Sequence, residues 1–248
     1  MQKKNYFFTI VTPNYLNQAL IWYESMIDSV MLASSYDNNK YLFEIYLLGC
    51  VEKVNVKNNH AIKYVEDCID NSIIDEITKK YTPAESCWVL KSFLLEYLIN
   101  QKFEYVFYFD SDIYLFGNLY EISRQMNNVS ILLTPHYLIQ YPTDNFTPTE
   151  LTLLRAGLFN AGFIGVRNTE EARRFLHWWQ AKNLAFGYNE PNKGMCGDQR
   201  WLDLVPILFN NVKICQHKGF NVAYWNLHER NISILNGKYY CGNDPLIF

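Results

Sequence analysis

The sequence has no CxxC pair, no run of basic residues and no uncharged apolar stretch long enough to span a bilayer. Its 22 Lys and Arg residues against 25 Asp and Glu residues give a formal net charge of −3, which argues against a nucleic-acid partner. The six cysteines lie far apart, which favours reduced, buried thiols over a disulfide framework or a zinc site. The apolar run after Lys3 and Lys4 is short and is broken at Thr12, so we expect no signal peptide and a cytoplasmic protein.

Internal repeats, low-complexity segments and composition shifts are also missing, and this predicts a single domain over residues 1–248. The 49% hydrophobic and 17% aromatic content supplies ample material for its core. The many aromatic residues leave peripheral association with the inner face of the cell membrane open as a hypothesis.

The most informative stretch is FEYVFYFDSDIYLF at residues 103–116. It is almost continuously apolar, as in a strand buried on both faces of a sheet, but Asp110 and Asp112 interrupt it. Side chains alternate along a strand, so we expect the two carboxylates on one face with Cα atoms roughly 6.6 Å apart. Two like charges beside an apolar strand are tolerable when a cation lies between them, and hard oxygen ligands favour Mg²⁺ or Mn²⁺.

The alternative is that Asp110 and Asp112 simply end the strand, one capping a turn and the other solvated. Against this, apolar residues resume at once with Ile113 and continue to Phe116, unlike an ordinary polar loop. The metal interpretation is therefore the better one.

Strand and helix patterns alternate along the chain, which predicts an α/β fold with a mostly parallel, Rossmann-like central sheet flanked by helices. Residues 34–40 read as a polar loop, and the Pro/Thr-rich loop at 135–148 has the composition of a lid over a ligand. The expected strands are residues 6–11, 42–48, 61–65, 103–116, 129–134 and 159–166, and the expected helices are 15–33, 82–100, 119–126, 149–156, one opening at 168–171, and 198–205.

Three polar residues in apolar surroundings are further site candidates. Lys91 has apolar neighbours at helical spacing and needs an anionic partner, either a bound diphosphate or a side chain such as Glu85 or Asp110; the other reading is an ammonium that extends to solvent. Asn160, in a strand rich in small residues, would face a ligand or form a turn. Asp198 would either join the site or only cap the helix that follows. Residues 220–230 mix aromatic and amide side chains, which would suit stacking on a sugar ring or an ordinary packed β-hairpin.

Taken together, these patterns resemble the glycosyltransferases of GT-A fold, above all the glycogenin-like family eight and related bacterial surface-polysaccharide transferases. The resemblance covers nearly the whole chain, and it implies a donor-binding half over about residues 1–116 and an acceptor and active-site half over about residues 117–248. The residues that carry it, in chain order, are Thr12-Pro13-Asn14-Tyr15, Lys91, Asp110-Ser111-Asp112, Asn160-Ala161-Gly162 and Asp198-Gln199.

The resemblance assigns roles to these residues. It implies that Thr12, Asn14 and Tyr15 surround the base and ribose of a nucleotide and that Lys91 faces the donor diphosphate.

It further implies that Asp110, Ser111 and Asp112 bind the nucleotide, with Asp110 and Asp112 holding Mn²⁺ or Mg²⁺. Asn160 would also contact the donor, while Asp198 and Gln199 would act on the transferred sugar.

The chain departs from the family pattern at two places. Such enzymes carry a late His-x-x-Gly element that supplies a third metal ligand, and in similar sequences it follows a strand like the final residues here. Either that segment is missing or His217 or His228 replaces it; neither histidine is assigned as a ligand. Thr12 stands where many relatives have an acid, which puts the identity of the base in question.

The expected activity is metal-dependent transfer of a sugar from a nucleoside-diphosphate sugar, UDP-sugar favoured, to a glycan or lipid-linked glycan acceptor in bacterial surface-polysaccharide synthesis. The resemblance implies retention of anomeric configuration and a hexosyltransferase. One alternative is a non-catalytic carbohydrate-binding or scaffold protein. Another is a phosphohydrolase that also uses an Asp-x-Asp pair, although here Ile113 and Tyr114 follow the pair where that family has a small turn.

Overall fold

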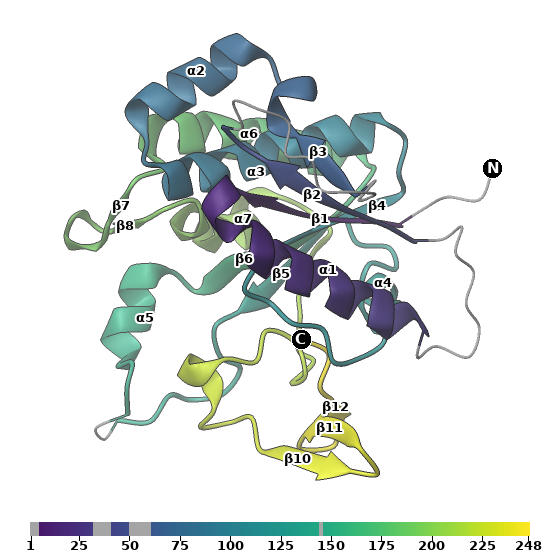
Figure 1. The fold of residues 1–248 in the computed structure, drawn as a ribbon. Helices are drawn as coiled ribbons and strands as arrows, with labels where there is room; N and C mark the ends of the chain where they lie inside the picture. Colours follow the sequence, from purple (N-terminus) through teal and green to yellow (C-terminus); the bar gives the residue numbers. More distant parts are fainter. Residues whose placement is uncertain (1–4, 32–40, 50–60, 144–145) are drawn as a thin grey trace.

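The computed structural model describes residues 5–31, 41–49, 61–143 and 146–248, so the loop predicted at 34–40 and Cys50 lie outside the described residues. Among the described residues, seven strands form one sheet that runs through both halves of the chain (Figure 1). In spatial order the strands are β3 (Ile62–Tyr64), β2 (Tyr41–Leu47), β1 (Asn5–Val11), β4 (Tyr105–Phe109), β6 (Phe159–Arg167), β5 (Ile131–Pro135) and β9 (Val212–Ile214). β1 pairs in parallel with β2 and β4, whereas β6 is antiparallel to both β4 and β5.

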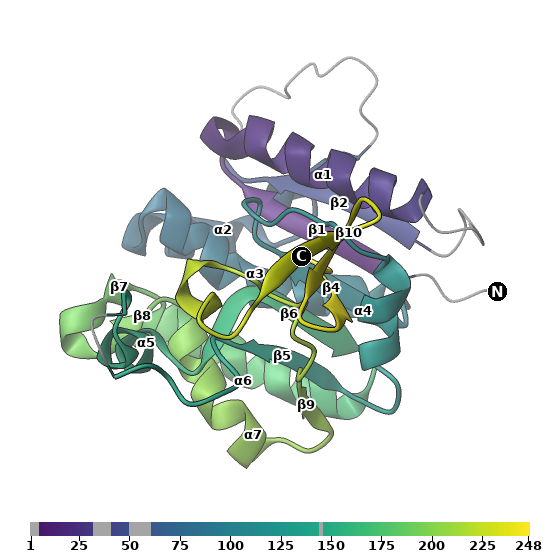
Figure 2. The same ribbon diagram turned by 90° about the horizontal axis from the view of Figure 1, so that it is seen from below.

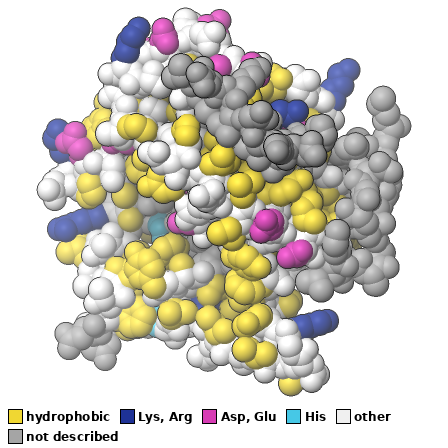
Figure 3. Space-filling model, viewed as in Figure 1, with side chains coloured by type: hydrophobic (Ala, Val, Ile, Leu, Met, Phe, Trp, Pro, Cys, Tyr) yellow, Lys and Arg dark blue, Asp and Glu magenta, His cyan; other side chains and the backbone are white. Residues whose placement is uncertain are grey.

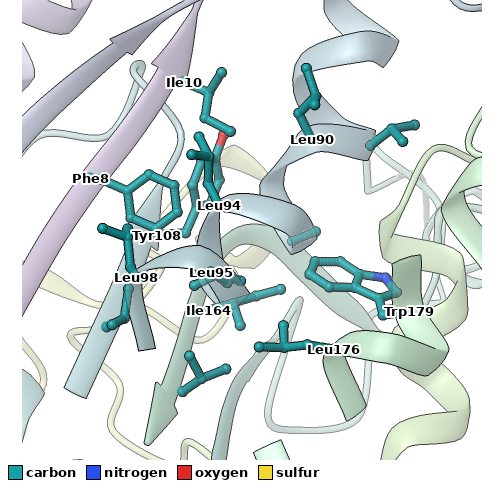
Figure 4. Packing of buried hydrophobic residues seen from close by; sticks show 14 of the residues in the cluster. Phe8, Ile10, Leu90, Leu94, Leu95, Leu98, Tyr108, Ile164, Leu176 and Trp179 are labelled. Atoms are coloured by element: carbon teal, nitrogen blue, oxygen red, sulfur yellow. The ribbon is translucent and has the colours of Figure 1, made fainter. Parts of the chain in front are cut away.

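Helices cover both faces of this sheet, which confirms the predicted α/β architecture. Apolar residues alternate between two clusters, with Phe7 of β1 in one and Phe8 in the other. The helices are α1 (Leu16–Met31), α2 (Asn71–Lys80), α3 (Pro83–Asn100), α4 (Leu119–Gln125), α5 (Glu150–Ala156), α6 (Glu170–Phe186) and α7 (Val205–Leu208). The cluster of Phe8 includes residues of α3 and α6, and Figure 4 shows Phe8 beside Leu98 of α3; the cluster of Phe7 includes residues of α1 and α4.

Local signals explain where several helices begin. Thr82 and Glu85 form the predicted capping box of α3, in which each side chain contacts the other residue's backbone. The sequence reading missed α2, which is N-capped by Asp70 through its side chain and the amide of Ser72. The predicted helix at 198–205 is instead a 3₁₀ helix, Gln199–Leu204, followed by the short α7.

The C-terminal part forms a small antiparallel sheet outside the main one. It consists of β10 (Ile232–Leu235), β11 (Lys238–Cys241) and β12 (Asp244–Pro245), and a second small hairpin joins β7 (Asn189–Glu190) to β8 (Met195–Cys196). Figure 1 shows the β10–β11 hairpin projecting below the body of the molecule, and in Figure 2, seen from below, the hairpin lies in front of the central strands. The hairpin suggested for residues 220–230 is wrong, because that segment contains a 3₁₀ turn, Tyr224–Asn226, and the hairpin begins after it.

Two further expectations concern cysteines and the membrane. The five described cysteines are all free thiols, as predicted; Cys87, Cys215 and Cys241 are also buried, whereas Cys68 and Cys196 are half-buried. Within the described part of the chain, none of the helices combines the length and the apolar character needed to cross a bilayer.

Candidate active site

The strand directions bring the candidate residues to one edge of the sheet. β1 and β4 are parallel, so Thr12 and Asp110, which follow their last residues, lie at the same edge. β6 runs the opposite way, and its first residues therefore meet the end of β4, where the amide of Asp110 donates to the carbonyl of Gly162 at 2.7 Å. The Asn-Ala-Gly segment and the Asp-Ser-Asp segment are thus neighbours in space.

The strand expected through residue 116 is wrong, because β4 ends at Phe109. Asp110 to Asp112 form a turn in which the amide of Ile113 donates to the Asp110 carbonyl at 3.2 Å. After the turn, backbone groups form hydrogen bonds outside the sheet. For example, the amide of Leu115 donates to Ser25 Oγ of α1 at 3.2 Å. The apolar residues that suggested a longer strand pack in this irregular segment, so strand alternation does not place the two carboxylates.

A buried tyrosine near the end of β4 fixes one oxygen of the Asp110 carboxylate. The hydroxyl of Tyr108 donates to Asp110 Oδ1 at 2.6 Å, and Tyr108 itself is buried. Burial and, second, the Asp110 charge raise the pKa of the Tyr108 phenol well above its ordinary value, so it remains a proton donor to the carboxylate. One Asp110 oxygen is thereby fixed, and the other points toward Gly162.

Lys91 has a partner that the sequence reading did not name. Its ammonium lies 2.8 Å from Asp198 Oδ2 and donates to the carbonyl of Ala161 at 2.8 Å, and both charged side chains are almost fully buried. The suggested pairing with Glu85 or Asp110 and the solvent-exposed reading are therefore wrong. Burial raises the pKa of the Asp198 carboxyl, and Lys91 opposes that shift.

Asp198 and Gln199 are tied to the surrounding backbone. Asp198 makes no side-chain cap on the helix that it precedes, which excludes the capping alternative. Gln199 accepts from the Ala161 amide at 3.4 Å and donates to the Ala156 carbonyl at 3.0 Å, so its amide bridges β6 and the end of α5. Contacts with Lys91, Ala156 and Ala161 therefore hold Asp198 and Gln199 beside the start of β6.

Three cavities meet at Asp110, which lines each of them. The lysine cavity, about 430 Å³, also contains Lys91, Asp198 and Gln199. The first-strand cavity, about 800 Å³, is lined by Thr12, Tyr15, Gln18, Trp88, Ser111 and Asp112. The C-terminal cavity, about 1090 Å³, is lined by Asp112, Asn160, Asn221, Tyr224, Trp225 and Phe248.

These cavities contain all but one of the residues singled out from the sequence. Asn14 is exposed in the 3₁₀ turn and lines none of the three. Asn160 lines the C-terminal cavity and also accepts from the Gly162 amide at 2.9 Å, so it combines the ligand-facing and turn-forming readings.

The sequence reading missed several lining residues. Trp88 lies three residues before Lys91 on α3 and lines both the lysine and first-strand cavities. The i, i+3 spacing of a helix face predicts this proximity, so the signal was present. Asn189 and Cys196 reach the lysine cavity through the β7–β8 hairpin, and no local sequence signal marks them.

Asp110 and Asp112 fit a divalent cation through their chemistry and surroundings. The carboxyl of Asp112 has a raised pKa, first because nearby protein desolvates it and second because Asp110 adds a like charge, a combination that a cation would relieve. Over the described ranges, no three or more His, Cys, Asp or Glu side chains group around one metal position. His217 and His228 line none of the three cavities, so neither replaces the expected histidine ligand in this arrangement.

Gly162 leaves room for the Asp110 carboxylate, and we predict that Gly162→Ala weakens metal binding. A Cβ at this position would lie 2.9 Å from Asp110 Oδ2 and 2.6 Å from Asn160 Oδ1, so the side chains must move. Disturbing groups that orient a metal ligand typically costs about 10- to 100-fold in affinity. Titration with Mn²⁺, followed by paramagnetic broadening of protein NMR signals, measures the change.

Gly165→Ala on the same strand is the matched control, because its Cβ would press on Phe107 at 3.0 Å in the core. We expect this variant to lose stability but to bind Mn²⁺ like the wild type. Equal Mn²⁺ affinity of wild type and Gly162→Ala would contradict this prediction.

His136 supports the wall of the C-terminal cavity and gives stability a pH dependence. Its buried ring packs edge-on against Trp225 at 5.6 Å between centroids, and burial lowers the pKa of the imidazole to about 4. Because the folded-state pKa lies below the unfolded value of about 6.5, the unfolded chain binds the proton first as the pH falls. The stabilisation is complete above pH 6.5 and declines toward about pH 4, by roughly 3 kcal/mol at 1.36 kcal/mol per pKa unit.

We expect His136→Gln to remove this component. Urea unfolding of wild type and variant at a series of pH values between 7.5 and 4 measures the difference, and His177→Gln on the surface is the control. Parallel pH profiles for wild type and His136→Gln would contradict the prediction.

The amino-acid sequence is similar to two bacterial proteins, although it matches no family model. It is 26% identical over 203 residues to the uncharacterized protein YfnF of Bacillus subtilis, covering 80% of this chain and 65% of YfnF. It is 29% identical over 169 residues to YfnD of the same organism, covering 66% of this chain and 52% of YfnD. The chain thus spans between half and two thirds of the length of these relatives.

Solved structures establish the fold. The galactosyltransferase LgtC, in complex with donor and acceptor sugar analogs, superposes with a TM-score of 0.56 at 13% identity, over 86% of this chain and 74% of LgtC. The bifunctional glycosyltransferase WbbM gives 0.52 at 12% identity, over 88% of this chain and 40% of WbbM. Mouse xyloside xylosyltransferase 1 gives 0.50 at 14% identity, over 86% of each chain. The chain has the GT-A fold of glycosyltransferases, as the sequence resemblance predicted.

Proposed function

We propose that this chain transfers a sugar from a nucleoside-diphosphate sugar to a glycan or lipid-linked glycan acceptor. The observation that carries the proposal is the convergence of three cavities on Asp110, because a transferase must bring a nucleotide, a sugar and an acceptor to one point. A fold can carry many functions, and here the chemical groups around Asp110 support this activity beyond the GT-A fold itself.

The first-strand cavity fits the nucleotide. Tyr15 and Trp88 supply aromatic surface for a base, while Thr12 and Ser111 supply hydroxyl groups for a ribose. Asp110 and Asp112 would hold Mn²⁺ or Mg²⁺, which supplies Lewis-acid stabilisation of the departing diphosphate. UDP is the favoured nucleotide from the sequence resemblance.

The lysine cavity fits the transferred sugar. It lies against Asp110 on the side of Lys91, Asp198 and Gln199 and has the smallest volume of the three. The buried Lys91–Asp198 pair would orient polar groups toward sugar hydroxyls, and the Lys91 charge would stabilise the leaving diphosphate. We assign the C-terminal cavity, with Tyr224 and Trp225, to the acceptor sugar.

The reaction would break the bond between the anomeric carbon and the diphosphate oxygen and form a bond to an acceptor hydroxyl oxygen, whose proton would pass to the departing nucleoside diphosphate. We propose retention of configuration, with bacterial surface polysaccharide as the product and the inner face of the cell membrane as its place of synthesis. NMR of the product tests retention, since an inverted linkage would contradict it.

Thermal unfolding with a panel of UDP-, GDP-, CMP- and dTDP-linked ligands, each with and without Mn²⁺, tests the donor site. At a ligand concentration 100 times Kd, binding adds about 2.7 kcal/mol, which raises Tm by roughly 5–10 °C for a chain of this size. We expect a Mn²⁺-dependent rise with one nucleotide class. No rise with any nucleotide would contradict the proposal, and glycan binding without sugar transfer would favour a non-catalytic carbohydrate-binding protein.

A further inference from the structure

A fourth cavity, the hairpin cavity, lies between α1, the segment after Asp112 and the turn of the β10–β11 hairpin. It is about 1470 Å³ in volume and larger than the three cavities at Asp110. Aromatic surface comes from Tyr114, Phe116 and Tyr239, and polar groups come from Asp28 of α1 and Glu121 of α4. The proposed donor and sugar sites use none of these side chains.

The hairpin cavity is continuous with the C-terminal cavity through two shared residues. Tyr114 and Phe116 line both cavities, and 45% and 42% of their surfaces are exposed. The rings of Tyr114 and Phe116 are 5.0 Å apart, and those of Phe116 and Tyr239 are 5.2 Å apart. A row of three aromatic rings therefore leads from the Asp pair to the hairpin, and in Figure 3 hydrophobic surface extends from the centre of the molecule down to this end.

Backbone hydrogen bonds hold this row in place. The amide of Phe116 donates to the Ile247 carbonyl at 2.8 Å, and the amide of Leu246 donates to the Tyr239 carbonyl at 2.9 Å. Gly117 packs so closely on the same segment that a Cβ would lie 2.7 Å from the Leu246 carbonyl oxygen. The rings are thus preorganised, which lowers the entropic cost of binding a ligand along them.

The chemistry of the row favours carbohydrate. Exposed aromatic faces with carboxylate and amide groups beside them offer both stacking surface and hydrogen-bond acceptors for sugar hydroxyls. The charged side chains of the hairpin cavity are Asp28, Glu121 and Lys238, two acidic and one basic. This balance disfavours an anionic glycan or the anionic surface of a membrane.

We propose that the hairpin cavity binds the distal sugars of an uncharged oligosaccharide acceptor whose terminal sugar occupies the C-terminal cavity. The inference rests on the proposed function and deepens it, because it makes the acceptor a chain of several sugars. Recognition would extend along Tyr114, Phe116 and Tyr239 away from the reacting end.

Binding to an immobilised array of neutral glycans, from monosaccharides to hexasaccharides, tests this inference with fluorescently labelled protein. We expect oligosaccharides to bind more tightly than the corresponding monosaccharides. Tyr239→Ala should weaken oligosaccharide binding about tenfold, the scale of one lost aromatic contact, and should leave monosaccharide binding unchanged. Tyr120→Ala, at an exposed tyrosine outside the cavity, is the matched control and should bind like the wild type.

Asp110→Asn separates this inference from the proposed function. It should lose the Mn²⁺-dependent effect of nucleotides on Tm yet keep the preference for longer glycans. Equal binding of monosaccharides and oligosaccharides, with the nucleotide effect intact, would overturn the distal site alone. Sedimentation with phosphatidylcholine–phosphatidylglycerol vesicles that is lost in Tyr239→Ala would overturn it in favour of a lipid-binding surface.

Discussion

Replacing Asp110 by asparagine is expected to abolish the Mn²⁺-dependent rise in Tm with the donor nucleotide and to lower the transfer rate by about 10²- to 10³-fold. Asp110 is the residue shared by all three cavities, and its carboxylate is one of the two that would hold the cation. Asparagine still accepts the hydrogen bond from Tyr108, so the fold should remain intact. Thermal unfolding and radiolabelled sugar transfer on the same samples measure both effects.

Asp75→Asn is the control for this substitution, because Asp75 is exposed on α2 and pairs with Lys79 of the same helix at 3.7 Å. Its Tm and its response to nucleotide and Mn²⁺ should match those of the wild type. A wild-type nucleotide response in Asp110→Asn would remove the basis for a metal at the Asp pair.

Replacing Lys91 by methionine is expected to cost about 3–5 kcal/mol of folding stability, because it leaves the Asp198 carboxylate buried without its partner. For a chain of this size, that lowers Tm by roughly 6–20 °C. Transfer should fall by about 10²-fold or more, since the positive charge at the lysine cavity is lost. Calorimetry and urea unfolding measure the stability, and sugar transfer is assayed below the variant's Tm.

The double variant Lys91→Met with Asp198→Leu separates the two effects. Replacing both members of a buried pair by apolar residues is often neutral for stability, so we expect the double variant to recover much of the lost Tm while remaining inactive. Lys79→Met, which breaks an exposed pair, should change stability by less than about 0.5 kcal/mol. A double variant that transfers sugar at the wild-type rate would exclude Lys91 and Asp198 from the reaction.

The parts of the fold that sequence predicts best are those that neighbouring residues decide. The capping box of Thr82 and Glu85 lies within one turn, so the start of α3 is readable from four consecutive residues. The apolar runs of β1 and β4 are readable for the same reason, since a strand covered on both faces needs them continuously. The helix α2 was missed although its signals are local, because Asp70 caps its start and Ile74 and Ile77 lie on one buried face.

The end of β4 is a case in which the local pattern misled. Residues 113–116 are as apolar as the strand before them, but their backbone bonds to α1 and to the C-terminal segment. Whether an apolar residue lies in a strand or packs in an irregular segment depends on the hydrogen-bond partners of its backbone. Those partners are distant in the sequence, and the local pattern does not contain them.

The amino-acid sequence by itself determined the alternation of strands and helices, the capping of α3 and the chemical identity of the Asp pair. The tertiary structure alone decided that Lys91 pairs with Asp198, because a buried ammonium pairs with the carboxylate that folding brings close to it. It also decided that β6 runs antiparallel to β4, which places Gly162 beside Asp110. The physical reason is the same in both cases: charge neutralisation and backbone pairing act over a few ångströms in space, irrespective of separation along the chain.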